Sequence, residues 1–437
     1  MTTAGVLAPY FARLESCSGT RWQGRITQVV GSMVESEGPF CSVGEFCHLI
    51  DSRGNILPGE VVGFRGPIVL SMPLARPDGL RYGDRVVTWG ARACIPVGAA
   101  LLGRVIDGSG VPLDSRPPAE SKEFRRLDGQ APLPLERAAI REAVGCGVRA
   151  IDAMLTCGRG QRVGIFGGSG VGKSTLIGMM ARNTEADVIV LALVGERGRE
   201  VREFLGGALG ERGRERSVVV VSTSDQSPLL RIRAALSATA IAEYFCGQGK
   251  QVLLVVDSLT RLAMAQREIS LAAGEPPTAK GYTPSVFSML ARLVERAGNF
   301  GAGSITAFYT VLMEGDDEQD PLVDGVRALL DGHIMLDRRL AARGHYPPIS
   351  VLDSVSRLMP AVCSRAHMRK AQQLRQLLAS YRVSEDLLRI GAYQKGSDPT
   401  LDQAIAWMPR IEQLLCQAPE ESAPLAASIE QLLALLG

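Results

Sequence analysis

The chain has 437 residues, 46% of them hydrophobic and 22% charged, as in an ordinary soluble protein, and its formal net charge is +2. This length allows two or three domains with substantial cores, and the near-neutral charge argues against nucleic acid or an anionic membrane surface as the main partner. No apolar run is long enough to cross a membrane, and the first residues lack the basic and apolar regions of an export signal. The nine cysteines are scattered without a CxxC pair, which indicates reduced thiols and a cytoplasmic protein.

The first twenty residues contain a short amphipathic pattern, because Leu7, Tyr10, Phe11 and Leu14 recur at helical spacing. Such a terminal helix either packs against its own domain or provides a docking face for a partner. The residues alone leave both interpretations open.

Between Trp22 and Trp89, short apolar runs alternate with turns that contain glycine, proline and asparagine. The runs are 26–30, 60–64, 68–70 and 85–88. Evenly spaced short strands of this kind predict a small all-β barrel. With the terminal helix, this barrel would form an N-terminal domain of residues 1–92.

The central region is predicted to be an α/β domain of residues 93–362. It begins with a connector in which 101–105 are expected to form a strand before a tight turn and a proline-rich stretch. Its later strands are apolar throughout, which is typical of a parallel sheet with helices on both faces. These runs are 162–166, 188–194, 218–221, 252–256, 304–312 and 333–336.

The last part of the chain, residues 363–437, is predicted to form a helical domain. Leucine, isoleucine and methionine recur at helical spacing in three groups, centred near 375, 410 and 432. Pro409 is expected to interrupt the second group, because proline cannot donate the next helical hydrogen bond.

A complete phosphate-binding loop follows the apolar run that ends at Phe166. It matches G-x-x-x-x-G-K-[ST] and consists of Gly167, Gly168, Ser169, Gly170, Val171, Gly172, Lys173 and Ser174, with Thr175 opening the next helix. Glycines allow the backbone N–H groups to point at phosphate oxygens, and the helix adds its positive N-terminus. Lys173 is expected to reach the β- and γ-phosphates of ATP, and Ser174 to ligate Mg²⁺.

Carboxylates at the ends of two further strands complete the predicted catalytic site. Asp257 ends the run 252–256 and is expected to bind Mg²⁺ through a water molecule. Glu196 follows the run 188–194 and is the predicted general base or water-orienting residue, because the carboxyl ends of parallel strands face the ligand crevice. Arg197 is a candidate contact for the γ-phosphate, and Glu200 for a magnesium-bound water.

Several stretches resemble the ATPase of bacterial type III protein export, a family similar to the catalytic subunits of rotary ATP synthases. They include GGSGVGKST, VGERGREVREF, VVDSLTRLAMAQREI, GEPPTAKGYTPSVF, GSITAFYTVLMEGDD, GHYPPISVLDSVSR and IGAYQKGSDPTLDQAI. The resemblance covers nearly the whole chain from about Gly24 onward. AKGYTPSVF and GERGREVREF favour the flagellar branch over the virulence injectisome.

The resemblance assigns roles that spacing alone does not. Tyr346 corresponds to the aromatic residue that stacks on adenine, and Arg357, in SVSR, corresponds to the arginine finger that reaches the γ-phosphate of the neighbouring subunit. On the residues alone, Arg338, Arg339 and Arg343 compete with Arg357 for this role. Arg261 is a further candidate for approaching the phosphates.

The resemblance also implies the assembly and its partners. Non-catalytic subunits of rotary ATPases lack the carboxylate at position 196, whereas this chain carries both Glu196 and Arg357 and could provide both halves of a shared site. A cytoplasmic homo-hexameric ring is therefore expected, at the cytoplasmic face of the inner membrane with peripheral association through the apparatus. Its implied partners are a stator-like regulatory protein at the N-terminus, a central stalk protein, the export gate, chaperones and export substrates.

The sequence also bears on three other functions. A rotary ATP synthase or ion pump would be expected to have an acidic C-terminal lever, and the helical region has no such run. An RNA-translocating ATPase would need an aromatic and basic N-terminal barrel, but residues 22–89 have few aromatics and no basic cluster. A ring that serves chiefly as an assembly scaffold is not excluded by the sequence.

Overall fold

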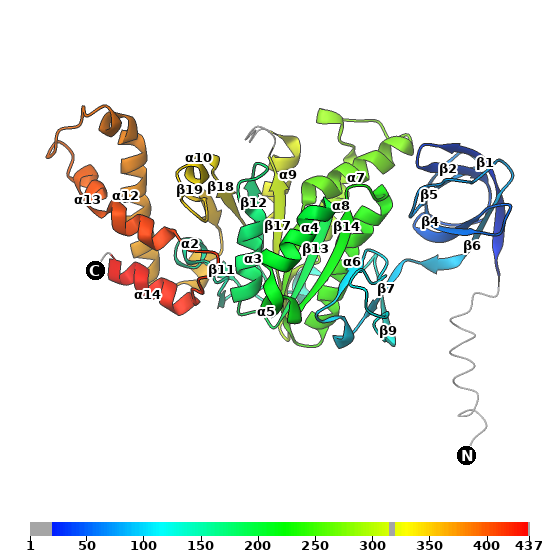
Figure 1. Ribbon diagram of the computed structural model, residues 1–437, viewed down its shortest axis with the longest axis horizontal. Coiled ribbons are helices and arrows are strands. Elements are labelled where there is room, and N and C mark those ends of the chain that lie inside the picture. The colour runs from blue at the N-terminus through cyan, green and yellow to red at the C-terminus, as the bar shows by residue number, and fades with distance from the viewer. Residues whose placement is uncertain (1–19, 314–319, 436–437) are drawn as a thin grey trace, which may run out of the picture.

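The computed structural model describes residues 20–313 and 320–435. It consists of a β-barrel at one end, an α/β domain in the middle and a helical domain at the other end (Figure 1). The predicted amphipathic pattern of Leu7, Tyr10, Phe11 and Leu14 lies outside the described residues. Within those residues, no helix combines the length and apolar character that a membrane crossing requires.

The N-terminal barrel is closed and has the strand order β1-β2-β5-β4-β3-β6. Its strands are β1 (Trp22–Val30), β2 (Met33–Glu37), β3 (Glu45–Ile50), β4 (Ile56–Arg65), β5 (Ile68–Pro73) and β6 (Arg85–Arg92). Alternate side chains, including Ile26, Val34 and Leu49, fill the interior. The predicted barrel is therefore confirmed. β2 and β3 lie outside the predicted runs because β2 has only two adjacent apolar residues and His48 interrupts the apolar residues of β3.

The connector after the barrel differs from its prediction. Residues 101–105 do not form a strand, because Ala99–Leu101 is a 3₁₀ turn and Gly103 adopts a positive φ of 75°. The strand here is β8 (Val105–Asp107), which joins the edge of the central sheet beside β14. A separate two-stranded ribbon pairs β7 (Cys94–Val97) with β9 (Glu123–Arg126).

The central sheet has the order β19-β18-β12-β17-β15-β13-β14-β8, with β16 pairing β17 beside this path. Its main strands are β12 (Arg162–Gly167), β13 (Val188–Glu196), β14 (Ser217–Thr223), β15 (Gln251–Asp257), β17 (Ser304–Leu312), β18 (Gly332–Leu336) and β19 (Ile349–Ser356). Neighbours along the path from β18 to β8 are parallel, and β19 runs antiparallel to β18. The mainly parallel sheet is as predicted, and β8 and β19 extend it at its two edges.

Both faces of the sheet are covered, which explains why its strands are apolar throughout. On β13, Val190 and Val194 belong to the hydrophobic cluster that also contains residues of helices α6 (Pro228–Gly247), α7 (Leu259–Ala272), α8 (Pro284–Val294) and α9 (Pro321–Leu329). The alternate residues Ile189 and Leu191 pack with α3 (Lys173–Asn183) and α2 (Arg149–Met154). The remaining short segments are α4 (Gly198–Glu203), α5 (Gly210–Glu215), α10 (Arg338–Ala342), α11 (Met359–Val362), β10 (Ala143–Val144), β11 (Cys157–Gly158) and β16 (Gly298–Asn299).

The C-terminal domain is helical, as predicted, with α12 (Arg365–Arg389), α13 (Pro399–Leu415) and α14 (Leu425–Leu435). The expected interruption at Pro409 was wrong, because α13 continues through this residue. Proline removes only the hydrogen bond to the carbonyl four residues earlier. That residue, Ile405, is exposed, so water can satisfy its carbonyl.

Candidate functional site

The candidate site lies at the carboxyl ends of four adjacent strands of the central sheet. The order β12-β17-β15-β13 brings together Gly167, Leu312, Asp257 and Glu196. A cleft of about 480 Å³ opens above these ends, and its lining includes the phosphate loop, Glu196, Arg197, Glu200, Asp257 and Arg261. The sheet topology therefore assembles residues that are up to 145 positions apart in the sequence, counting from 167 to 312.

The phosphate loop curls between β12 and α3, and Gly170 and Gly172 have positive φ angles of 76° and 108°. Lys173 begins α3 and is only 8% exposed. Its ammonium donates to the carbonyls of Gly167 at 2.8 Å and Gly168 at 2.5 Å. Burial lowers the pKa of Lys173 to about 8, although the nearby Asp257 and Glu196 carboxyls oppose this change. A cation and a helix N-terminus thus face the cleft, which is an arrangement that binds phosphate.

Ser174 and Asp257 provide oxygen donors that fit Mg²⁺. The Ser174 side chain is exposed toward the cleft in the first turn of α3. Asp257 is 6% exposed, and Thr310 Oγ1 on β17 donates to its Oδ1 at 2.6 Å. Burial raises the pKa of this carboxyl, while the hydrogen bond from Thr310 opposes the rise. In the described ranges, no group of three or more His, Cys, Asp or Glu could hold a metal.

Glu196 occupies the end of β13, where a register shift between Val194 and Glu196 follows the positive φ of Gly195. Its Oε1 lies 3.2 Å from Nε of Arg261, in the first turn of α7. Burial, together with a hydrogen bond with Glu200, raises the pKa of Glu196 to about 8. The same bond lowers the pKa of Glu200. The pair therefore has one carboxyl poised to exchange a proton near neutral pH and one that stays ionised.

Arg197 differs from its neighbours in exposure. Its side chain is 79% exposed, and its Nη1 lies 3.9 Å from Oε1 of Glu200. It therefore lines the cleft without being fixed in it.

The sequence prediction missed Thr310, which fixes Asp257. A threonine within the apolar run 304–312 was the available signal, because a polar group in a buried strand needs a partner.

The segment that carries Tyr346 lies beside the phosphate loop. A Cβ on Gly172 would be 3.8 Å from Cδ of Pro348, so the two segments lie close together. The backbone carbonyl of Tyr346 accepts from the N–H of Gln417 at 2.8 Å, which ties this segment to the C-terminal domain. The side chain of Tyr346 is 48% exposed, and Tyr346 is not among the residues that line the phosphate cleft.

Arg357 lies near the amino ends of the parallel strands, whereas the phosphate loop lies at their carboxyl ends. β19 ends at Ser356, which pairs with Gly332 at the start of β18. The next residue of β18, His333, pairs with Gly164 near the start of β12, whereas the phosphate loop follows the end of β12. The structure therefore does not bring Arg357 to the cleft of its own chain. Its side chain is exposed.

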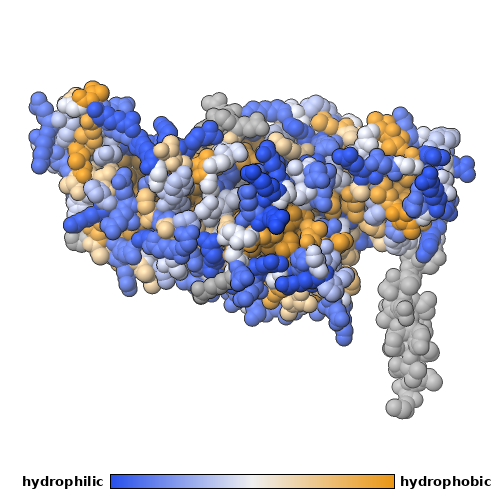
Figure 2. Space-filling view, in the orientation of Figure 1, coloured by the Kyte–Doolittle hydropathy of each residue, from blue (hydrophilic) through white to orange (hydrophobic). Residues whose placement is uncertain are grey.

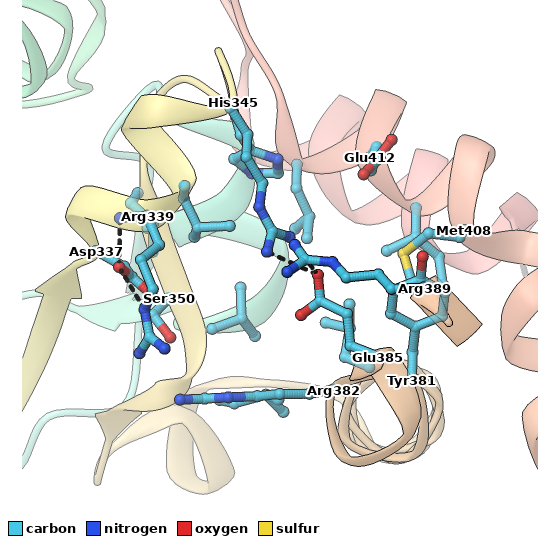
Figure 3. Close-up of a pocket in the computed structure, with 18 of the residues that line it drawn as sticks. Asp337, Arg339, His345, Ser350, Tyr381, Arg382, Glu385, Arg389, Met408 and Glu412 are labelled. Atoms are coloured by element: carbon cyan, nitrogen blue, oxygen red, sulfur yellow. Dashed lines mark hydrogen bonds and ion pairs between the residues drawn. The ribbon is translucent and has the colours of Figure 1, made fainter. Parts of the chain in front are cut away.

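The competing arginines have different surroundings. Arg338 is near enough to Lys173 to lower its pKa, so it lies on the phosphate-loop side. Arg339 and Arg343 line a second cleft of about 390 Å³ between the central and helical domains (Figure 3). There Arg339 lies 3.6 Å from Asp337, and Arg343 lies 2.7 Å from Glu385 on α12. Both guanidinium groups are therefore engaged within their own chain.

Comparisons with known proteins agree with this architecture. Residues 26–90 match the β-barrel domain of the ATP synthase alpha/beta family, and residues 147–356 match the nucleotide-binding domain of the same family. Residues 363–434 match the T3SS EscN ATPase C-terminal domain. The flagellum-specific ATP synthase of Bacillus subtilis is 49% identical, over 97% of this chain and 97% of that protein.

Two solved structures extend the likeness to three dimensions. The assembled ATPase EscN from the type III secretion system of enteropathogenic E. coli has a TM-score of 0.90 and 44% identity, over 95% of this chain and all of that one. EscN in complex with its central stalk EscO has a TM-score of 0.87 over the same coverage. The chain therefore belongs to the ATPases of flagellar and type III protein export, a family within the ATP synthase alpha/beta proteins.

Proposed function

We propose that the chain hydrolyses ATP at the junctions between subunits of a homo-hexameric ring, and that this turnover serves flagellar type III protein export. The observation that carries this proposal is the separation of the two halves of the site. The phosphate loop and Glu196 lie at the carboxyl ends of the parallel strands, and Arg357 lies near their amino ends. Head-to-tail contact between copies would bring Arg357 of one copy to the phosphate loop of the next and would complete a site at each junction.

The residues around the cleft suit the two ends of the reaction. Lys173 and the N-terminus of α3 would hold the β- and γ-phosphates, with Arg197 at the mouth of the cleft. Ser174, Asp257 through a water, and Glu200 through a second water would hold Mg²⁺, which supplies neutralisation of phosphate charge when bound. Glu196 would take a proton from the attacking water. The oxygen of this water would bond to the γ-phosphorus while the bond between the γ-phosphorus and the leaving ADP oxygen breaks. A pKa of about 8 suits this proton acceptor at cellular pH.

The adenine base would stack on Tyr346 beside the phosphate loop. Support comes from the closeness of Pro348 to Gly172 and from the half-exposed tyrosine side chain. A base placed there would contact both the central domain and the segment that Gln417 ties to the helical domain. Binding of ATP would then be felt in both domains.

Arg357 would act as the arginine finger of the neighbouring site. Its exposure near the amino ends of the strands, away from the phosphate loop, supports this role, as does the pairing of Arg339 and Arg343 with carboxylates of their own chain. A fixed guanidinium at the γ-phosphate stabilises transition-state charge and can raise turnover by about 10³ to 10⁵.

The helical domain would contact the central stalk. Val383, Leu387 and Ile390 of α12 and the turn after it are 85%, 49% and 75% exposed, and they recur at helical spacing. Figure 2 shows hydrophobic surface at the outer end of this domain. The solved complex of EscN with EscO makes a stalk protein a suitable occupant.

Family membership supports the remaining partners and the domain division. We propose domains of residues 1–92, 93–362 and 363–437, and a cytoplasmic ring at the inner membrane that meets the export gate, chaperones and export substrates. A stator-like protein would bind the N-terminal segment. A strain that lacks its own flagellar export ATPase tests the whole proposal. Wild type should restore secretion of flagellar subunits and Glu196→Gln should not, whereas restoration of virulence secretion alone would contradict the flagellar assignment.

A further inference from the structure

We propose that Gln161, acting through Ser356, is a positioning residue for the Arg357 guanidinium that serves the neighbouring subunit. The inference rests on the proposed role of Arg357 as a finger and adds the group that would hold it in place. Gln161 comes just before β12 and is completely buried. No role in nucleotide binding accounts for it, because it lies at the amino end of β12, whereas the phosphate loop follows the carboxyl end.

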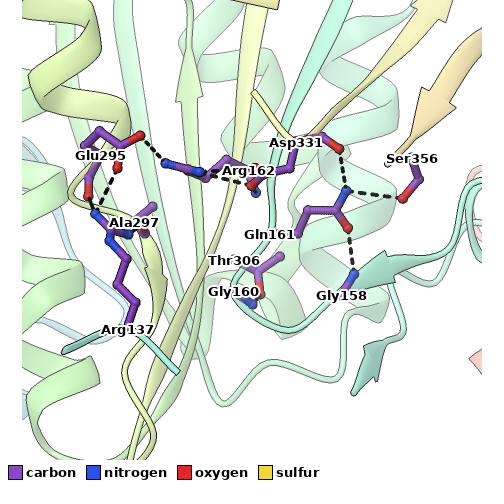
Figure 4. A network of polar contacts seen from close by, with 10 residues as sticks. All are labelled: Arg137, Gly158, Gly160, Gln161, Arg162, Glu295, Ala297, Thr306, Asp331 and Ser356. Carbon is purple, nitrogen blue, oxygen red and sulfur yellow. Dashed lines mark hydrogen bonds and ion pairs between the residues drawn. The ribbon is translucent and has the colours of Figure 1, made fainter. Parts of the chain in front are cut away.

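The Gln161 side-chain amide makes three hydrogen bonds, to which both its oxygen and its nitrogen contribute (Figure 4). Its Oε1 accepts from the N–H of Gly158 at 2.7 Å. Its Nε2 donates to the carbonyl of Asp331 and to Oγ of Ser356, both at 3.2 Å. Ser356 in turn donates from Oγ to the carbonyl of Thr156 at 2.9 Å. The residue immediately before Arg357 is thus bonded on both sides to buried groups.

The backbone of Arg357 is attached to the same point. Its N–H donates to the carbonyl of Asp331 at 3.0 Å, the carbonyl that also accepts from Gln161. The neighbouring Gly332 lets the strands approach closely, because a Cβ there would lie only 2.5 Å from the carbonyl oxygen of Val355. The end of β19 therefore cannot shift without breaking several buried contacts.

A chain of charged groups immobilises Asp331 itself. Arg162 donates to Oδ2 of Asp331 from its backbone N–H and from Nε, both at 3.0 Å, and to Oδ1 from Nη2 at 3.1 Å. Arg162 also donates to Glu295 at 2.5 Å, and Glu295 accepts from Arg137 at 3.0 Å. The side chains of Arg137 and Arg162 are only 21% and 18% exposed, whereas that of Glu295, which links them, is 44% exposed.

The hydrogen-bonded cluster of Gln161, Ser356 and Asp331 is called the mount of Arg357. It matters because a long, exposed arginine must meet a phosphate on another copy of the chain. The described part of the chain fixes Arg357 only through its backbone, so the position of that backbone sets where the guanidinium reaches. A displacement of about 1 Å at a catalytic group can cost about 100-fold in rate. Moreover, β12 begins beside Gln161 and ends at Gly167, so one strand joins this mount to the phosphate loop of the same subunit.

The first test compares single substitutions in the full-length ATPase. Ser356→Ala and Gln161→Leu should each lower kcat about tenfold, with little change in KM and in the Kd for a fluorescent ATP analogue. Ser354→Ala is the matched control, because this buried serine of β19 bonds Met335 and Ser350 and not the mount. It should keep wild-type kcat. If Gln161→Leu fails to fold, Ser356→Ala provides the test.

The second test is a double-mutant cycle with Arg357→Ala. If Gln161 and Ser356 act through Arg357, their substitution should not lower kcat further in the Arg357→Ala background. An equal fractional fall in both backgrounds, or no fall in the wild-type background, would overturn the inference. Should Arg357→Ala itself keep wild-type turnover, the finger assignment in the proposed function would fail first. The two failures are therefore distinguishable.

Discussion

Glu196 at the end of β13 and Arg261 at the start of α7 form an ion pair whose Oε1 and Nε atoms lie 3.2 Å apart. Their contact is close because Gly195 has no side chain, and a Cβ there would lie 2.9 Å from Cδ of Arg261. Burial raises the pKa of Glu196 to about 8, and the Arg261 guanidinium opposes this rise. Arg261 is therefore one of several groups that act on the proton affinity of the proposed base, and it favours the ionised carboxylate.

Arg261→Ala should shift the pH dependence of turnover. Without the guanidinium, the pKa of Glu196 rises further, so the ionised base is lost at a higher pH. The acid limb of kcat/KM should move about one pH unit upward, as measured between pH 6 and 9. Arg267→Ala is the control, because that residue of α7 contacts the Tyr282 ring and not the cleft. An unchanged acid limb in Arg261→Ala would mean that another group titrates.

Glu196→Gln should abolish turnover, spare ATP binding and stabilise the nucleotide-free chain at high pH. A raised pKa means that ionisation of Glu196 is penalised in the folded state, so wild type loses stability as pH rises from about 4.5 to about 8. Glutamine removes this penalty, and the lowered pKa of Glu200 offsets part of the gain. Thermal unfolding should show a Tm gap that grows from pH 5 to 8. The same gap in Glu268→Gln would contradict this explanation.

Mixed rings should reveal whether sites are shared. Lys173→Ala and Arg357→Ala rings should each lose turnover by at least about 100-fold, while the folded protomer persists. When the two variants are combined, some junctions should contain an intact Lys173 from one copy and an intact Arg357 from the other. A steady-state ATPase assay should then recover part of the activity. Absence of recovery, with mixing verified by differently tagged subunits, would argue that each chain contains its whole site.

Arg233→Met should destabilise the junction between the barrel and the central domain. Arg233 of α6 is 4% exposed, donates to Glu60 of β4 at 2.8 Å and lies over the Phe46 ring. Its loss would leave Glu60 without this partner and should cost about 3 kcal/mol in urea unfolding. Arg231→Met is the control, because the side chain of its partner Glu268 is 51% exposed, and it should cost under about 1 kcal/mol. Equal losses would assign the effect to packing alone.

The fold was predictable wherever burial imposed a simple pattern. Strands covered on both faces, such as Val252–Val256, are apolar throughout and were found. β2 and β19 lie outside the predicted runs because polar residues interrupt their apolar ones, namely Glu35 and Ser36 in β2 and Asp353 and Ser354 in β19. The course of α13 through Pro409 could not be predicted, since it depends on whether the freed carbonyl of Ile405 reaches solvent.

The site was predictable as a set of residues but not as an arrangement. Motif spacing identified the phosphate loop, and strand ends identified Glu196 and Asp257, because parallel strands place their carboxyl ends together. The support that Thr310 gives to Asp257 and the pairing of Glu196 with Arg261 depend on strand order. Spacing did not reveal that order. The roles of Arg357 and Tyr346 rest on family resemblance and stay predictions.

The position of Arg357 near the amino ends of the strands, away from the phosphate loop, has a consequence for mass action. With Arg357 acting as proposed, an isolated chain holds no complete site, and a closed ring holds as many as it has subunits. Specific activity would then climb steeply with protein concentration, while nucleotide affinity of the dilute chain would change little. Whatever gathers subunits at the export machinery would thereby switch on hydrolysis, and chains dispersed in the cell would consume little ATP.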